Sequence, residues 1–359
     1  MGSICFFNTA IAWGGGEKWH FEVSQHLHNK GIPVFVVAHS KSILLEKLKK
    51  TDIPHKEIAL SNLSFINPLK IVLVRNILKT CIIDSIVMNL SSDVKIAGPI
   101  AKSLNINRVI YRRGSAIPIK DTFLNRYLFK KVLTEILANS IATKKTVLEY
   151  NPKLFPNEKI TVIYNGVKVP KLPKTDNHPE KNKTITLINL GRLEHQKNQG
   201  FLLDVAKKLL QKGIDFKLLI GGEGRLHDEL QSRINNEGLS KNVELRGFIK
   251  KPYDFISMGD VFLLSSHWEG FGYVLAEAAL CGKPSIAFNI SSNPEVVVHQ
   301  KTGILTPPNN IDSFVEAIEI FAKDKSLIEK MGVAARAFAV NQFEKSKKLR
   351  EIEAYLIDE

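Results

Sequence analysis

Short apolar runs alternate with amphipathic stretches along almost the whole of this 359-residue chain, and this alternation restricts the possible folds most. Residues 4–8 and 34–38 have the length and the apolar content, β-branched and aromatic, of buried strands, whereas residues 17–30 repeat their apolar side chains at helical spacing. Strands that alternate with helices predict βαβ units and a mainly parallel sheet. The fold class that we expect is therefore α/β.

The alternation is interrupted once, at residues 168–183, where proline and lysine replace the apolar periodicity. A chain of this length fits two domains of about 150–200 residues each. We expect a first domain at 1–167, a second at 184–340, and a last segment, 341–359, whose helix packs back on the first domain. The expected strands are 4–8, 34–38, 85–89, 108–112, 185–190, 217–221, 243–247, 261–265 and 284–287, and the expected helices include 17–30, 124–131, 199–212, 226–237, 252–258 and 273–281.

One turn in the second half places two carboxylates beside a pair of glycines. Glu269 precedes Gly270-Phe271-Gly272, and Glu277 follows in the predicted helix that begins near Tyr273. The amides of this turn would lie at a helix N-terminus, where phosphate binds well. A phosphate site between two carboxylates suits a nucleotide sugar, whose ribose and hexose hydroxyls the carboxylates would hold. An ordinary strand–helix junction with two surface glutamates is the alternative.

Three other loops at predicted strand ends carry glycine or cations. The loop after 185–190 places Arg192 near Lys197, and two cations beside a diphosphate would stabilise the charge on a leaving nucleotide. The loop Gly221-Gly222-Glu223-Gly224, which follows 217–221, lacks the Lys-Ser/Thr pair of a P-loop. Two solvated loop cations are the alternative for Arg192 and Lys197, and an ordinary strand terminus is the alternative for Arg246 and Phe248. The binding candidates in these loops are Gly191, Gly222, Arg246 and Phe248.

The composition indicates a globular protein, and the distribution of charge indicates the kind of partner that the first half binds. The apolar fraction of 44% and the charged fraction of 24% are those of a globular protein. Residues 1–166 hold 23 Lys and Arg against 11 Asp and Glu, and the remainder holds 27 against 25, so the first half carries +12 of the net +14. This asymmetry predicts an anionic partner for the first half, with a solvated basic surface as the alternative.

Other features bear on the compartment. No stretch approaches 18 consecutive apolar residues, and the N-terminus lacks the basic region and cleavage site of a signal peptide. Cys5, Cys81 and Cys281 are too widely spaced for a disulfide framework or a zinc site. We therefore expect a cytoplasmic protein.

Taken in series, these loops resemble those of a known family. The second half is similar to the C-terminal domain of retaining, family-4-type glycosyltransferases (glycosyl transferases group 1), enzymes with the GT-B fold, in which two Rossmann-like doubly wound domains face each other across a cleft. The resemblance is to the bacterial type that builds lipopolysaccharide and other surface polysaccharides. The matching segments are Gly191-Arg192-Leu193 with Gln196-Lys197, Gly221-Gly222-Glu223-Gly224, Arg246-Gly247-Phe248, Glu269-Gly270-Phe271-Gly272 with Glu277, Ser291-Ser292-Asn293-Pro294-Glu295, Thr302-Gly303, and in the first half Gly14-Gly15-Gly16-Glu17, Asn139-Ser140 and Tyr164-Asn165-Gly166-Val167.

The resemblance implies a hexosyltransferase and a role for each matched residue. Arg192 and Lys197 would bind the donor diphosphate, and together with Glu269 they form the expected catalytic group. Glu277 would hold the ribose hydroxyls. The donor is expected to be a UDP-sugar, and neither a metal nor another cofactor is expected. The remaining donor-binding residues implied by the family are Gly15, Gly16, Gly191, Gly222, Arg246, Phe248, Gly270, Phe271, Gly272 and Tyr273.

The first half departs from the family pattern at one strand end. Where many relatives carry a His-Gly pair, this chain has Arg112-Arg113-Gly114. Two adjacent arginines could bind a phosphate or carboxylate of the acceptor, or they could form a solvated strand end. Trp13 is a further acceptor-binding candidate, whereas Trp19 is expected in the core. His195 and His267 lie in separate loops without a third ligand, which favours loop-lining roles over metal binding.

The expected function is transfer of a sugar from a nucleotide sugar to an anionic or lipid-linked glycan. The basic first half is expected to dock on the inner leaflet, and residues 124–131 suit an interfacial helix, with burial of their apolar face as the alternative. A nucleotide-sugar epimerase of the same fold, which would act on the donor alone, stays open. Nucleic acid is not an expected partner, because the chain shows no RRM, KH, helix-turn-helix or zinc signature.

Overall fold

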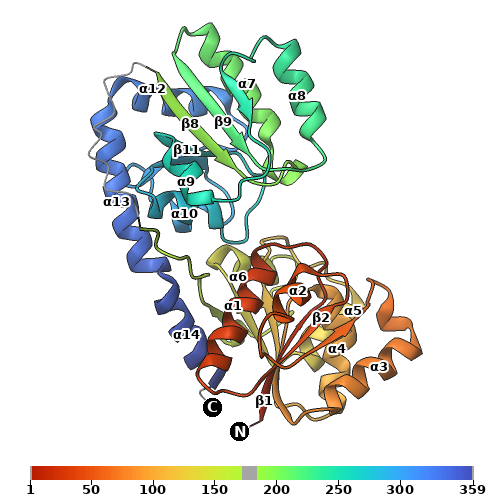
Figure 1. Cartoon of the computed structure of the whole chain (residues 1–359). Helices are drawn as coiled ribbons and strands as arrows, with labels where there is room; N and C mark the ends of the chain where they lie inside the picture. The colour runs from red at the N-terminus through yellow and green to blue at the C-terminus, as the bar shows by residue number, and fades with distance from the viewer. Residues whose placement is uncertain (1, 172–183, 358–359) are drawn as a thin grey trace. The chain divides into compact units, whose positions relative to one another are not determined.

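The computed structural model describes residues 2–171 and 184–357 and divides the chain into two compact units. The first unit consists of Met1–Asn165 together with Ser346–Glu359, and the second of Gly166–Lys345 (Figure 1). Most of the expected linker, residues 172–183, lies outside the described residues. No helix in the described part of the chain combines the length and the hydropathy needed to cross a membrane.

The first unit is built on one seven-stranded sheet with the order β3-β2-β1-β4-β5-β6-β7. Every neighbouring pair of strands is parallel. The strands are β1 (Ser3–Asn8), β2 (Val34–His39), β3 (His55–Ile58), β4 (Ile83–Met88), β5 (Arg108–Arg113), β6 (Glu135–Ala138) and β7 (Ile160–Val162). The helical segments are α1 (Gly15–Asn29), α2 (Ile43–Leu48), η1 (Ser64–Ile66), α3 (Pro68–Lys79), α4 (Ser91–Ser103), α5 (Phe123–Tyr127), η2 (Leu128–Val132), α6 (Ile141–Leu148), η3 (Asn157–Lys159) and α14 (Lys345–Ile357).

Both faces of this sheet are covered, which explains the continuous apolar runs of its strands. On β1, Cys5 and Phe7 belong to a buried cluster that includes side chains of α3 and α4. Ile4 and Phe6 point to the opposite face and belong to a cluster that includes side chains of α1, α2 and α14. The first unit therefore has a core on each side of its sheet.

The C-terminal helix α14 belongs to this first unit and lies beside α1 (Figure 1). Its side chains Ile352 and Leu356 are buried in the cluster shared with α1. Glu353 accepts a hydrogen bond from Lys30 at 2.7 Å. Arg108 donates to the backbone carbonyl of Leu356 at 3.1 Å, which attaches the end of the chain to the start of β5.

The second unit is built on a six-stranded parallel sheet with the order β10-β9-β8-β11-β12-β13. The strands are β8 (Ile185–Leu190), β9 (Phe216–Gly221), β10 (Val243–Leu245), β11 (Val261–Leu264), β12 (Ser285–Phe288) and β13 (Gly303–Thr306). The helical segments are η4 (His195–Lys197), α7 (Gln199–Gln211), α8 (His227–Asn236), α9 (Pro252–Ser257), α10 (Tyr273–Leu280), α11 (Asn293–Val296), α12 (Ile311–Lys323) and α13 (Lys325–Phe343). Its main core lies between the sheet and α7, α8 and α12.

The strand order reverses once in each sheet, between β1 and β4 in the first unit and between β8 and β11 in the second. Ligands of doubly wound sheets bind outside the carboxyl ends of the strands at this switch point. The predicted α/β class, with two doubly wound Rossmann-like sheets, is confirmed. The two switch points are the places to examine for function.

The expectation for residues 124–131 is wrong in one respect. Helix α5 ends at Tyr127, and the chain continues through the π-helical turn η2. Leu128 and Phe129 are buried in the core, so these apolar side chains are not available to a membrane. The alternative of a buried apolar face therefore holds. The expected strand 243–247 is also shorter than predicted and ends at Leu245.

Candidate active site

A Lys–Glu ion pair lies at the switch point of the second sheet. Lys197 comes from η4, which follows β8, and Glu269 comes from the loop that follows β11. The Nζ and Oε1 atoms are 2.5 Å apart, and the side chains are 14% and 8% exposed. Limited access of water strengthens the attraction between these charges and makes either one costly to leave unpaired. The two strands at the switch point thus place one fixed cation beside one fixed carboxylate.

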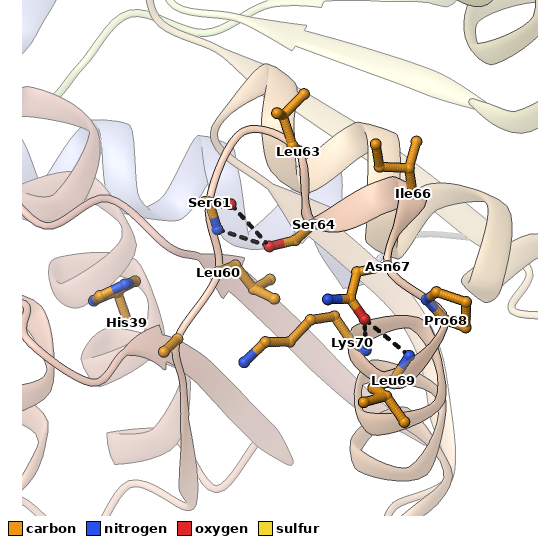
Figure 2. A pocket seen from close by; sticks show the side chains of 11 residues that line it. His39, Leu60, Ser61, Leu63, Ser64, Ile66, Asn67, Pro68, Leu69 and Lys70 are labelled. Atoms are coloured by element: carbon orange, nitrogen blue, oxygen red, sulfur yellow. Dashed lines mark hydrogen bonds between the residues drawn. The ribbon is translucent and has the colours of Figure 1, made fainter.

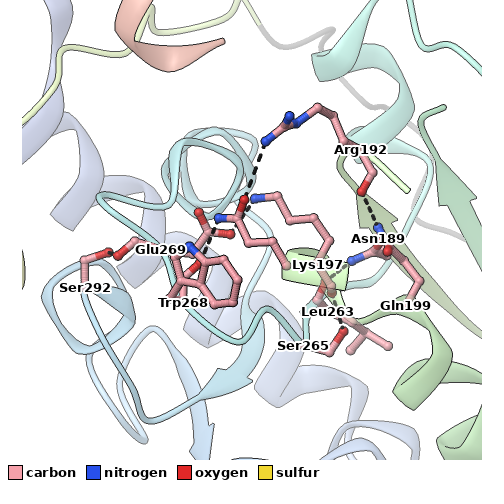
Figure 3. A network of polar contacts seen from close by, with 10 residues as sticks. Asn189, Arg192, Lys197, Gln199, Leu263, Ser265, Trp268, Glu269 and Ser292 are labelled. Carbon is pink, nitrogen blue, oxygen red and sulfur yellow. Dashed lines mark hydrogen bonds and ion pairs between the residues drawn. The ribbon is translucent and has the colours of Figure 1, made fainter. Parts of the chain in front are cut away.

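Neighbouring side chains hold the loop that carries Glu269 (Figure 3). The side-chain amide of Gln196 donates to the backbone carbonyl of Trp268 at 2.9 Å. The hydroxyl of Ser292 donates to the backbone carbonyl of Glu269 at 3.1 Å. Because the backbone on both sides of the glutamate is anchored, its carboxylate is oriented without any ligand.

The loops after β8 and β9 contact each other through their backbones. The amide of Gly191 donates to the carbonyl of Gly221 at 3.0 Å, and the amide of Leu193 donates to the carbonyl of Glu223 at 2.9 Å. A Cβ atom on Gly222 would lie 1.9 Å from the carbonyl oxygen of Gly191, and the φ angle of Gly222 is +133°. Only glycine permits both this approach and this backbone conformation.

The turn Gly270-Phe271-Gly272 forms the entrance to α10. Gly272 is the N-cap residue of this helix and adopts the left-handed conformation, with φ of 74°. Phe271 is buried and contacts the ring of Phe343 edge to face, which fixes the turn. The N-terminus of α10, which begins at Tyr273, carries partial positive charge and suits an anion. Glu277 lies further along the same helix and is half-buried.

The structure brings some of the predicted residues together and separates others. Arg192 is exposed, and its Nη2 atom donates to Oε1 of Gln196 at 3.5 Å, so its guanidinium lies beside the loop of the ion pair (Figure 3). Arg246 and Phe248 follow the edge strand β10, which β9 separates from β8. Arg246 pairs with Glu244 at 3.0 Å. Phe248 is 73% exposed, so its ring is open to a planar ligand.

Four buried oxygen atoms around this switch point have no hydrogen-bond partner within the part of the chain that the structure describes. They are Oδ1 of Asn189, Oε1 of Gln199, Oγ of Ser266 and Oδ1 of Asn293. The last lies 3.8 Å from the position that a Cβ atom on Gly272 would take. Because an unpaired buried polar atom costs free energy, these oxygens favour a site that a polar ligand or water completes.

Family models match the sequences of both parts of the chain. A model described as Glycosyl transferases group 1 matches residues 171–338, and one described as Glycosyltransferase Family 4 matches residues 13–170. The chain is built from two glycosyltransferase domains.

Individual proteins agree with this assignment of the domains. The chain is 30% identical over 204 residues to an uncharacterized glycosyltransferase of Methanocaldococcus jannaschii, an alignment that covers 51% of this chain and 50% of that protein. It is 30% identical over 211 residues to a UDP-Gal:alpha-D-GlcNAc-diphosphoundecaprenol alpha-1,3-galactosyltransferase of Escherichia coli, covering 56% and 54%. The chain thus spans about half the length of these curated relatives.

The fold of the chain also matches that of a solved structure. The Anabaena protein HepE in complex with UDP and glucose matches with a TM-score of 0.84, 20% sequence identity and coverage of 99% of each chain. Identity this low shows the fold alone, and the fold is GT-B.

The first glycosyltransferase domain carries a buried arginine beside its own switch point, on the strand next to β4. Arg112, at the end of β5, is 3% exposed. It donates through Nη2 to Oδ1 of Asn165 at 2.9 Å and through Nη1 to Oδ1 of Asn89 at 3.5 Å. Its guanidinium lies 5.1 Å from the ring centre of Trp19, and Asn89 donates in turn to Glu17 at 2.9 Å. Amide oxygens, an aromatic face and a linked carboxylate together offset the cost of burying this cation.

The idea that the two arginines form a solvated strand end is wrong. Arg113 is also buried, and its guanidinium donates to the carbonyl of Ile117 and to the hydroxyl of Tyr111. Both side chains are enclosed because residues from other segments close over the end of β5. Recognition of an acceptor by Arg112 and Arg113 stays a prediction.

The glycine loop before α1 lies against the same polar network. A Cβ atom on Gly16 would lie 2.7 Å from Nδ2 of Asn89, so a side chain at this position would displace the amide that holds Glu17. Gly15 is the first residue of α1. Trp13, just before the loop, is half-buried, and the Nζ atom of Lys47 lies 4.9 Å from its ring centre.

Burial also changes the protonation of two groups near this network. Asp93 accepts hydrogen bonds from the amides of Leu90 and Thr9 at 2.9 and 3.4 Å. Burial nevertheless raises the pKa of Asp93 to about 7, because desolvation of the carboxylate outweighs these bonds. Burial, helped by the charge of Arg112, lowers the pKa of His20 well below its ordinary value. The imidazole is therefore neutral at physiological pH.

The two loop histidines remain loop-lining residues. His195 and His267 are exposed, and the ring of His267 stacks on that of Trp268 with an interplanar angle of 23°. Among the described residues, no group of three or more His, Cys, Asp or Glu side chains is placed to hold a metal ion.

Sequence analysis missed the polar side chains that support the site. Asn189 donates to the carbonyl of Leu263 at 2.9 Å and so links the ends of β8 and β11. Gln199 donates to the carbonyl of Arg192 at 3.0 Å (Figure 3). For Asn189 the signal in the sequence was one uncharged polar residue within the otherwise apolar end of the run 185–190, whereas Gln199, at the start of α7, gave no such signal.

Proposed function

We propose that this protein transfers a sugar from a nucleotide-diphosphate sugar to a hydroxyl group of a glycan or lipid-linked acceptor, with retention of the anomeric configuration. The observation that carries the proposal is the Lys197–Glu269 pair at the switch point of the second sheet, in the loop that leads to the N-terminus of α10. The two glycosyltransferase domains support the class of reaction.

In this proposal the donor diphosphate binds between the loop after β8 and the N-terminus of α10. Arg192 and Lys197 neutralise the phosphates, and Gly191, Gly222 and Gly272 let the backbone come close to them. Lys197 is largely withdrawn from water, so it stabilises the charge that develops on the leaving nucleotide better than a solvated lysine would.

In this proposal the sugar, the ribose and the nucleobase of the nucleotide sugar contact side chains that border the same loops. Glu269, with the amides of the turn that follows it, holds the donor sugar. Glu277 holds the ribose hydroxyls. The exposed ring of Phe248 and the guanidinium of Arg246 contact the nucleobase. These roles are supported by the position of the residues at strand ends and by the family pattern.

The reaction itself is a substitution at the anomeric carbon. The acceptor oxygen forms a bond to this carbon while the bond from the carbon to the phosphate oxygen breaks. The electron pair of the broken bond stays on the nucleotide diphosphate, whose phosphate accepts the proton of the acceptor hydroxyl. Atoms and charge balance without an oxidant, a metal or another cofactor, and we propose that none is required.

The donor is proposed to be a UDP-sugar and the acceptor a precursor of a surface polysaccharide. The E. coli relative is named for a UDP-Gal donor and an acceptor carried on undecaprenyl diphosphate, and the Anabaena structure holds UDP. The excess of cations in the first half of the chain supports an anionic acceptor. We place the enzyme in the cytoplasm, at the inner surface of the membrane.

Thermal shift with UDP, GDP, ADP and CMP tests the donor site directly. We expect one nucleotide, UDP, to raise the melting temperature of the wild type, and Glu277→Ala to lose this shift. Glu229→Ala, an exposed carboxylate at the start of α8, is the matched control and should keep it. Equal shifts with all four nucleotides, or a shift unchanged in Glu277→Ala, would contradict the assignment.

A further inference from the structure

An exposed apolar face covers η1 and the outer side of α3 in the first unit. We define the α3 face as Leu63, Ile66, Leu69, Val72 and Leu73. These side chains are 65%, 65%, 80%, 54% and 42% exposed. On α3, residues 69, 72, 73 and 76 follow helical spacing, so three of the five apolar side chains form one stripe along the helix.

This stripe is additional to the face with which α3 packs against the sheet. Val74, Ile77 and Leu78 are buried in the core of the unit and already account for the folding of the helix. A helix on the surface of a globular domain ordinarily carries charged or polar residues on its other face. A contiguous exposed apolar patch instead marks a surface that binds something.

A hollow of about 720 Å³ lies beside the α3 face (Figure 2). Its lining includes His39 at the end of β2, the serines 61 and 64, Lys70, and three residues of the α3 face, Leu63, Ile66 and Leu69. The side chain of Asn67 accepts hydrogen bonds from the amides of Leu69 and Lys70 at 3.0 and 3.3 Å. The start of α3 is therefore fixed, and its apolar residues are held out from the surface.

The charged side chains of the segment that carries this face are all cationic. Residues 58–83 contain Lys70, Arg75 and Lys79 but no aspartate or glutamate. Lys95, from the neighbouring helix α4, lies 5.5 Å from the ring centre of Phe65 in η1. A surface that binds an anionic membrane typically combines apolar side chains with cations beside them.

We propose that the α3 face docks on an anionic lipid bilayer. The five apolar side chains enter the boundary between headgroups and acyl chains, and Lys70, Arg75, Lys79 and Lys95 contact the headgroup phosphates. The inference deepens the proposed function, on which it rests for the lipid-linked acceptor that would lie at the same surface. It replaces residues 124–131 as the place of membrane contact, because the apolar side chains Leu128 and Phe129 are buried.

A second copy of the chain is a poorer occupant of the α3 face. In a two-fold interface the same surface meets itself, so the cations of one copy would face those of the other without a carboxylate from residues 58–83 to balance them. A bilayer supplies the opposite charge.

Vesicle co-sedimentation of the full chain tests the proposal. The probes are vesicles of phosphatidylcholine alone and of phosphatidylcholine with about 30% phosphatidylglycerol. The test variant is Leu69→Gln/Val72→Gln, which keeps helix-forming residues. The matched control is Val333→Gln on α13 in the second unit, an exposed valine on a helix.

We expect the wild type and Val333→Gln to bind the anionic vesicles at least about tenfold better than the neutral ones, since each cation near the surface contributes. The double variant should lose about tenfold in binding while its melting temperature and its shift with UDP stay as in the wild type. Unchanged vesicle binding by the double variant, or no binding by the wild type, would overturn the proposal. A dimer that only the double variant disrupts would also overturn it in favour of a second copy.

The UDP shift separates this inference from the proposed function. If vesicles bind but UDP has no effect on any form of the protein, the donor assignment fails and membrane docking stands. If UDP binds but the α3 face does not affect vesicle binding, docking fails and the donor assignment stands.

Discussion

The two switch points of this molecule have the same topology but enclose their charges differently. In the second sheet, Lys197 and Glu269 lie at the edge of glycine-rich loops, with the exposed Arg192 beside them. In the first sheet, Arg112 is enclosed between two asparagines and a tryptophan ring. The parallel sheet determines where a site can form, and the residues at the strand ends determine whether that place binds a ligand or supports the fold.

The two switch points differ in how easily a ligand can reach their polar groups. Glycine at residues 191, 222 and 272 leaves backbone amides approachable at the second switch point, and four buried oxygens there lack partners among the described residues. At the first switch point the cation already has protein partners on several sides. We therefore expect substitutions in the second sheet to change nucleotide binding and transfer, and substitution of Arg112 to change stability.

Gly222→Ala should have the largest effect, because its Cβ atom would overlap the carbonyl oxygen of Gly191. We expect a loss of about 3 kcal/mol or more in unfolding free energy, together with loss of the UDP shift. Gly213→Ala is the matched control, since Gly213 also has a positive φ but has no atom within 4 Å of the Cβ position. The control should lose only about 1 kcal/mol. Urea unfolding compares them, and equal losses would show that the contact between the loops is unimportant.

Glu269→Gln should lower the rate of sugar transfer by about 100-fold, because Lys197 loses its charged partner in a site with little water. Glutamine has the same shape, so the backbone bond from Ser292 remains and the fold is kept. Glu57→Gln breaks an exposed pair with Lys49 and serves as the control. Initial rates with a radiolabelled UDP-sugar measure the effect. A transfer rate close to that of the control would remove Glu269 from the mechanism.

Arg112→Lys should destabilise the first unit by about 2 kcal/mol. The planar guanidinium of arginine donates to Asn89 and Asn165 through two different nitrogens, and the single ammonium group of lysine cannot reach both. Arg126→Lys, in an exposed pair with Asp121, should change the melting temperature far less. Differential scanning calorimetry compares the two variants. If the buried substitution is as mild as the exposed one, the network around Arg112 does not support the fold.

Asp93→Asn should change how the stability of the protein depends on pH. The pKa of Asp93 is raised from 3.8 to about 7 in the folded protein, so between these values the folded state keeps a proton that the unfolded state has released. The wild type therefore loses stability as pH rises from about 4 to 7, and asparagine removes this contribution. The melting temperature of the variant relative to wild type should rise over this range. A constant difference would mean that Asp93 is ionised throughout.

Much of the fold was predictable because it depends on local pattern. The apolar run at residues 185–190 is bounded by polar Thr184 and by Gly191, and β8 has those bounds. The π-helical turn after α5 was not predictable, because the packing of Leu128 and Phe129 in the core decides it.

The site was predictable in kind but not in its contacts. Lys197 and Glu269 are 72 residues apart, and only the strand order of the sheet shows that they meet. The burial of Arg112 depends on Trp19 and Asn165, which come from distant parts of the chain. The exposure of the α3 face was hidden for a similar reason, since its apolar residues have the spacing of an ordinary buried helix.

Calorimetric titration of UDP into the wild type, Lys197→Met and Arg112→Lys tests most directly the claim that the second switch point binds the donor and the first does not. We expect Lys197→Met to weaken binding by about tenfold or more, the equivalent of losing one charge-assisted hydrogen bond to a phosphate. Arg112→Lys should leave the affinity within about twofold of the wild type. If Arg112→Lys weakens UDP binding as much as Lys197→Met does, or if Lys197→Met binds UDP as the wild type does, the account is wrong.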